Sequence, residues 1–173
     1  MNTHQEITLD LNADVVEWCP LQPHHRILAA GTYQLNEATQ QRTGRLYLYY
    51  LLDSLQVEEL CTHDLPGIFD FRWLPYSPHH QQNPILVTAL ADGTVRLIDF
   101  DSDTRTMTQQ AQAPSPPPST TSPSAMALSV ECAPPYSNAT GTAPERIASS
   151  FSDGSLTIFQ VRDAFFIFLF CSI

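Results

Sequence analysis

Three side chains in the middle of the sequence carry the functional groups of a hydrolase triad: the imidazole of His63, the hydroxyl of Thr88 and the carboxylate of Asp92. In such a triad the imidazole accepts the hydroxyl proton, and the carboxylate orients the imidazole. The nucleophile, however, is expected on an exposed turn, whereas Thr88 ends an apolar run that is typical of a strand. We therefore interpret these three residues as polar groups that stabilise β-structure.

Paired histidines are a second chemical feature, because imidazoles are common metal ligands. The pairs lie in the segments Pro23-His24-His25 and Pro78-His79-His80. Adjacent side chains of an extended segment point to opposite sides, so neither pair is expected to bind an ion. The 4 cysteines form no Cys-x-x-Cys pair, and the sequence contains no Gly-x-Ser-x-Gly, His-Glu-x-x-His or phosphate-loop motif. The sequence thus predicts neither a metal nor an organic cofactor.

The strands that must position these side chains belong to a sequence repeat with three copies. Each copy has a first strand, then an apolar run, then an alternating strand that follows a glycine. The first strands end at Trp18, Trp73 and Cys132, and the glycines are Gly44, Gly93 and Gly154. An Asp-Gly pair between two apolar runs, as at 92–93 and 153–154, is a strong hairpin signal. One such unit cannot bury both of its faces, so the repeat predicts stacked sheets.

These copies resemble the blades of WD-repeat proteins, although the Trp-Asp pair that ends the third strand of such blades is absent. In the second copy His63, Thr88 and Asp92 stand at positions of the hydrogen-bonded tetrad of that family. The resemblance implies an all-β chain that forms an incomplete WD-repeat β-propeller of about three blades, the last one partial. The residues expected to be structural in these blades are Trp18, Trp73, His63, Thr88, Asp92 and Asp153.

Composition divides the chain into four segments. Residues 1–108 are expected to form the first two blades, and 125–162 a partial third blade without its outer strand. Between them, 109–124 is rich in proline and serine and is predicted to be a disordered insertion. The apolar tail 163–173 is far shorter than the roughly 20 residues of a membrane-spanning helix, so no membrane partner is expected. Either the tail comes from a truncated or misread gene model, or it is a buried strand.

The charge of the chain limits its possible partners. The formal net charge is −10, and all 8 basic residues are arginine. Nucleic acids require a basic surface, so they are not expected as ligands. A cationic partner is compatible with this charge, but so is a simple role in solubility. The polar first ten residues are unlike a signal peptide, and the sequence therefore favours a cytoplasmic protein.

Three segments near the N-terminus carry a more specific resemblance. Residues 13–21 include Trp18-Cys19-Pro20, residues 27–35 include Ala30-Gly31-Thr32-Tyr33, and residues 43–49 form the strand after Gly44. Together they resemble the N-terminal part of the diphthine methyltransferase family, the WD-repeat proteins of the diphthamide pathway. Despite its name, that family is described as a methylesterase that removes the methyl ester of methylated diphthine on elongation factor 2.

This resemblance implies a carboxylic-ester hydrolase with elongation factor 2 as its protein substrate, and a fragment that is inactive by itself. In a WD propeller the start of the first strand and the end of the second share one rim, where Asp14, Glu17 and Tyr33 are expected. A carboxylate there could activate water, and a tyrosine with acidic neighbours suits the quaternary ammonium of diphthine. Alternatively these residues are solvated or packed side chains, and the protein is a non-enzymatic scaffold for other proteins.

Overall fold

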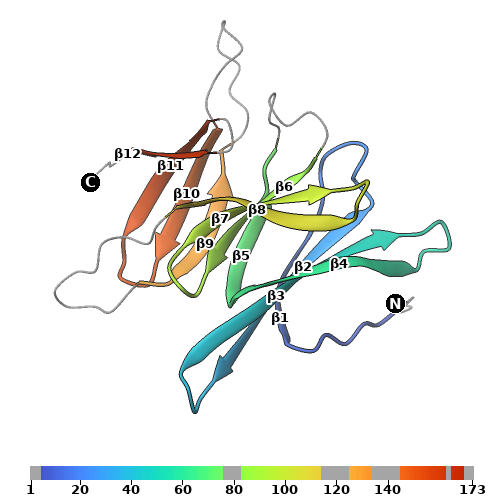
Figure 1. Ribbon diagram of the computed structural model, residues 1–173, viewed down its shortest axis with the longest axis horizontal. Helices are drawn as coiled ribbons and strands as arrows, with labels where there is room; N and C mark the ends of the chain where they lie inside the picture. Colours follow the sequence, from blue (N-terminus) through green and yellow to red (C-terminus); the bar gives the residue numbers. More distant parts are fainter. Residues whose placement is uncertain (1–4, 76–82, 114–124, 134–144, 163–164, 170–173) are drawn as a thin grey trace, which may run out of the picture.

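The computed structural model describes residues 5–75, 83–113, 125–133, 145–162 and 165–169. They form three antiparallel four-stranded sheets that lie side by side (Figure 1). In the first sheet the strands follow the chain, as β1 (Asn12–Trp18), β2 (Ile27–Asn36), β3 (Gln41–Leu51) and β4 (Val57–Pro66). The second sheet has β5 (Ile68–Trp73), β6 (Ile85–Leu90), β7 (Val95–Asp101) and β8 (Thr106–Ala113). The third has β9 (Ala127–Cys132), β10 (Glu145–Phe151), β11 (Leu156–Arg162) and β12 (Phe165–Leu169).

The predicted all-β class and the three-fold repeat agree with this architecture. The expectation of a third unit without its outer strand is wrong, because β12 pairs with β11 from Arg162↔Phe165 to Ile158↔Leu169. Strand β8 also extends into the segment predicted as an insertion, since Ala111, Gln112 and Ala113 pair with β7. Residues 114–124 and 170–173 lie outside the described residues, as do His79 and His80. In the described part of the chain, no helix is long and apolar enough to cross a membrane.

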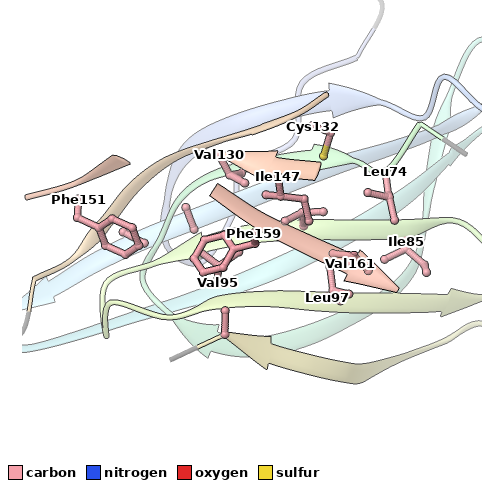
Figure 2. Packing of buried hydrophobic residues seen from close by; sticks show 14 of the residues in the cluster. Leu74, Ile85, Val95, Leu97, Val130, Cys132, Ile147, Phe151, Phe159 and Val161 are labelled. Atoms are coloured by element: carbon pink, nitrogen blue, oxygen red, sulfur yellow. The ribbon is translucent and has the colours of Figure 1, made fainter. Parts of the chain in front are cut away.

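We call the face that the second or third sheet packs on the preceding sheet its leading face, and the opposite face its trailing face. The equivalent faces of the first sheet take the same names. The leading face of the second sheet, with Phe71 and Trp73, packs on Leu46 and Leu48 of the first sheet. Figure 2 shows the next junction, where side chains of β9, β10 and β11 meet those of the second sheet. The three leading-face pairs are Val16/Trp18, Phe71/Trp73 and Val130/Cys132, and the three trailing-face pairs are Leu46/Leu48, Val95/Leu97 and Leu156/Ile158.

The hairpins before the third strands use the predicted Asp-Gly chemistry. Gly93 and Gly154 have φ angles of 80° and 86°, in the left-handed region where a glycine is unstrained. The preceding aspartates cap these turns, because Asp92 accepts a hydrogen bond from Thr94 N (3.0 Å) and Asp153 accepts one from Ser155 N (2.9 Å). The first copy instead has a longer turn between β2 and β3, where Asn36 accepts hydrogen bonds from Ala38 N and Thr39 N.

A short N-terminal arm, residues 5–11, lies over the outer part of the first sheet's leading face. The side chain of Gln5 bonds both the amide (2.8 Å) and the carbonyl (3.3 Å) of Val57 on β4. Leu9 packs on a small cluster that contains the stacked rings of Tyr47 and Tyr49. Asp10 lies 3.5 Å from Arg45. The arm therefore covers the β3 and β4 side of this face.

Candidate functional site

The first strands of the three sheets lie next to one another, so residues far apart in the sequence meet there. Strand β5 contacts β1 on one side and β9 on the other (Figure 1). Four charged side chains gather along these strands, one from β1, two from β5 and one from β9. We call them the first-strand cluster: Glu17, Asp70, Arg72 and Glu131.

Arg72 lies at the centre of the first-strand cluster. Its Nη1 donates to Asp70 Oδ1 and to the carbonyl of Phe71, both at 2.8 Å, and its Nε lies 3.5 Å from Glu131 Oε2. Burial disfavours the guanidinium charge, yet the carboxylates of Asp70, Glu17 and Glu131 raise the pKa of Arg72. The cluster thus holds one cation among three carboxylates, which leaves it acidic.

Glu17 connects the first two sheets. Its Oε2 accepts a hydrogen bond from Trp73 N, and its carbonyl accepts one from Trp73 Nε1, both at 3.3 Å. Burial raises the pKa of Glu17, while the bond from Trp73 and the charge of Arg72 oppose that rise. A carboxylate whose pKa is raised is a stronger base, which suits proton abstraction from water.

Asp70 connects the second and third sheets in a similar way. Its Oδ2 accepts hydrogen bonds from Ser129 Oγ and Val130 N, both at 3.0 Å, while its Oδ1 binds Arg72. Asp70 is buried. Asp70 is absent from the site residues expected above, although an acidic residue between Phe69 and Phe71 on a strand is a signal for such a site, because buried carboxylates require partners.

The structure does not bring Asp14, Glu17 and Tyr33 together. Tyr33 pairs with Asn12 near one end of β1, whereas Glu17 pairs with Ala29, four residues away along β2. At about 3.3 Å per residue, that separation is roughly 13 Å. Asp14 is exposed where the β1–β2 register shifts, and the Tyr33 ring packs 4.9 Å from that of Phe69. Of the three candidates, only Glu17 belongs to the first-strand cluster.

His63, Thr88 and Asp92 each interact with Arg96. Thr88 Oγ1 donates to the Arg96 carbonyl (3.3 Å), and Asp92 binds Thr94 and the Arg96 guanidinium. His63 lies on β4 of the first sheet, where burial lowers its pKa. Within the described residues no hydrogen bond joins these three side chains, so neither a triad nor a tetrad forms here.

The thiols of Cys19 and Cys61 are not activated nucleophiles. Burial raises the pKa of Cys19 and of Cys61 to about 11 each, so both remain protonated at neutral pH. Among the residues that the structure describes, no group of three or more His, Cys, Asp or Glu side chains is arranged to hold a metal ion.

Of the two tryptophans that were expected to be structural, Trp73 is buried at a junction, whereas Trp18 lies on the leading face of the first sheet and is half exposed. The repeat therefore gives equivalent residues different surroundings. The reason is that β1 belongs to the first sheet of the stack, and Trp73 packs on that sheet.

Fold and site together define the class of this protein: an all-β repeat protein whose four-stranded antiparallel sheets are joined along their first strands by a charged cluster. No protein-family model matches the chain. It is 29% identical to the diphthine methyltransferase of Homo sapiens over 92% of its length, and 32% identical to that of Mus musculus over 54% of its length. These matches support assignment of the chain to the diphthine methyltransferase family. The aligned part covers 38% of the human protein and 22% of the mouse protein.

Proposed function

We propose that this protein acts in diphthamide biosynthesis in the cytoplasm, by hydrolysing the methyl ester of methylated diphthine on elongation factor 2. The observation that carries the proposal is the match over 92% of the chain to a human protein named diphthine methyltransferase. We further propose that the three sheets are blades of a WD-repeat β-propeller. Four antiparallel strands per sheet, in chain order and with adjacent first strands, support this proposal.

Hydrolysis of this ester needs a base that activates water and a means of holding a cationic substrate. In the proposed reaction a water oxygen bonds to the ester carbonyl carbon, the bond to the methoxy group breaks, and methanol leaves with a proton. Glu17 is our candidate base, because it is a partly buried carboxylate with a raised pKa. Glu131 has an exposed side chain nearby and adds negative charge that attracts a quaternary ammonium group.

The test is methanol release from elongation factor 2 that carries methylated diphthine. A longer protein that contains this sequence should release methanol. It should leave diphthine with a free carboxylate on elongation factor 2, which mass spectrometry detects. The names of the relatives suggest the opposite reaction, methyl transfer, which would consume a methyl donor and add a methyl group. Methylation of unmodified diphthine without methanol release would refute hydrolysis.

Matched variants test the role of Glu17. Glu17→Gln keeps the size and the acceptor for Trp73 N but removes the base, so kcat should fall by about 100-fold or more. Asp14→Asn on the same strand is the control, because Asp14 is exposed and lies outside the first-strand cluster. Equal losses in both variants would remove Glu17 from the proposed mechanism.

A scaffold function is the second candidate, and exposed apolar side chains on the first and third sheets favour it. Such side chains are typical of surfaces that bind other proteins. A cell that lacks this protein but retains fully modified elongation factor 2 would support the scaffold and exclude the esterase.

A further inference from the structure

Three members of the first-strand cluster, Glu17, Arg72 and Glu131, occupy the same position of the repeat, one residue before the end of each first strand. They lie on β1, β5 and β9, which are neighbours in space. Strand β5 is the middle one of these three, so Arg72 has a described strand on either side. The repeat therefore places one cation between two carboxylates, in surroundings that the described residues define.

Glu17 and Arg72 both reach the edge of β5 that is not paired with β6. Glu17 accepts a hydrogen bond there from Trp73 N (3.3 Å), and Arg72 Nη1 donates there to the carbonyl of Phe71 (2.8 Å). Residues two apart direct their backbone groups to the same edge of a strand, at a spacing of about 7 Å. A carboxylate and a guanidinium are thus held against one strand edge, within reach of the same small group of a substrate.

The guanidinium of Arg72 is fixed on one side and accessible on the other. Its Nη1 donates to Asp70 Oδ1, and Asp70 is itself fixed because its Oδ2 accepts a hydrogen bond from Val130 N (3.0 Å). Arg72 Nη2 makes no hydrogen bond to any of the described residues. The Arg72 side chain is 34% exposed. A fixed guanidinium with an accessible N–H group is suited to bind an oxygen atom of a ligand.

We propose that Arg72 binds the carbonyl oxygen of the methyl ester and stabilises the negative charge that forms on it during hydrolysis. This role rests on the proposed function and adds a catalytic residue to it. Glu17 takes a proton from water, the water oxygen bonds to the carbonyl carbon, and an electron pair of the C=O double bond moves to the oxygen beside Arg72. The bond to methoxide then breaks, methoxide leaves with the proton from Glu17, and the acid product ionises. Fixed donors at such an oxygen accelerate acyl transfer, because the charge develops in the transition state.

The carboxylates around Arg72 allow a cationic substrate to bind beside it. A lone guanidinium would repel the quaternary ammonium group of diphthine. Here Asp70 pairs with Arg72, and Glu131, whose side chain is 70% exposed, lies on its other side. The ammonium group is therefore expected beside Glu131, with the ester carbonyl oxygen facing Arg72.

Steady-state kinetics of methanol release, by a longer protein that contains this sequence, test the role of Arg72. Arg72→Gln removes the charge and should lower kcat by about 100-fold with little change in KM, since the stabilised charge forms only after the substrate binds. Arg72→Lys keeps a positive charge beside Asp70, so it preserves the ion pair and should lose less activity. Arg45→Gln is the control and should keep the wild-type kcat, because Arg45 also lies beside two carboxylates, Asp10 and Asp64, but outside the first-strand cluster.

The wild-type protein separates the two levels of the proposal. A wild-type protein that releases no methanol would overturn the proposed function, and the role of Arg72 with it. If the wild type is active, equal kcat values for Arg72→Gln and Arg45→Gln would overturn the role of Arg72 alone. So would equal losses in Arg72→Gln and Arg72→Lys, or a change confined to KM, in variants that keep the circular dichroism spectrum of the wild type.

Discussion

At the scale of single residues, Glu17 has both a structural and a chemical interpretation. A partly buried carboxylate loses hydration, which disfavours its ionised form. The amide of Trp73 recovers part of that loss, and the same hydrogen bond joins the first two sheets. The geometry that makes Glu17 a stronger base therefore also gives it a role in stability, and the two roles respond differently to pH.

Glu17→Gln should change how stability depends on pH. Because burial raises the folded-state pKa of Glu17 above its unfolded value, the stability that its protonated form contributes is fully present below the unfolded pKa. It is lost as pH rises through the folded pKa. The wild-type protein should therefore lose stability relative to Glu17→Gln as pH rises above about 4, the ordinary pKa of a glutamate. Thermal melts across this range measure the difference, with Glu37→Gln in the β2–β3 turn as the control for charge removal. A pH-independent difference would contradict the role of burial.

Two glycines should respond differently to substitution by alanine. A Cβ at Gly44 would collide with the Thr32 carbonyl oxygen and lie 2.9 Å from that of Pro66, and backbone atoms cannot easily move aside. Gly44→Ala should therefore lower the free energy of unfolding by about 3 kcal/mol. At Gly154 the added Cβ meets no atom within 4 Å, so only the φ of +86° penalises alanine, by about 1–2 kcal/mol. Urea denaturation distinguishes the two, and equal costs would show that the close approach at Gly44 is easily relieved.

The residues of the first-strand cluster show what the sequence could and could not predict. Glu17 could be selected because its strand is recognisable from the repeat. Asp70 could not be assigned partners, because its hydrogen bonds come from Ser129 and Val130, about sixty positions further along the chain. Tyr33 was expected to meet Glu17, but it pairs with Asn12 near the other end of β1, and its ring packs against Phe69 on β5. Strand period predicts which face a residue occupies, but not which strand of another repeat it meets.

At the scale of elements, strand pairing outweighs composition at the end of β8. Gln109–Ala113 contains no large apolar residue, and so the sequence places it with the Pro/Ser-rich segment. In the structure it pairs with β7 and buries Ala113 completely, because small side chains fit between the second and third sheets. The repeat predicted the first three strands of each sheet, since their alternation and, in the second and third sheets, their Asp-Gly turns are local signals.

Deletion experiments test this boundary. Removing residues 109–113 should destabilise the second sheet by several kcal/mol, since it removes ladder hydrogen bonds and the buried Ala113. Removing residues 114–124 should change stability by less than about 1 kcal/mol, because loop-closure entropy varies slowly with length. The melting temperatures of the two deletions and the wild type give the comparison. A larger loss from the second deletion than from the first would reverse the assignment.

At the scale of the whole molecule, the contacts in the described part of the chain join the first sheet to the second and the second sheet to the third. The stability of such a stack is approximately the sum of the stability of each unit and of each junction. Besides apolar packing, hydrogen bonds from the first-strand cluster hold the junctions: Glu17 acts at the first, and Asp70 with Arg72 at the second. Weakening one junction should therefore release the sheet beyond it before the rest of the molecule unfolds.

Asp70→Ala should uncouple the third sheet from the second. The substitution removes the acceptor of Ser129 Oγ and Val130 N and leaves Arg72 without its nearest carboxylate, at a cost of about 2–3 kcal/mol. Hydrogen exchange should then accelerate in β9–β11 by more than tenfold, while β2 and β3 keep their protection. Asp64→Ala is the control, because it also removes an arginine partner, Arg45, but at an exposed site, where ion pairs contribute little. Uniform acceleration in all three sheets would show that the chain unfolds as one cooperative unit and that its junctions are not separable.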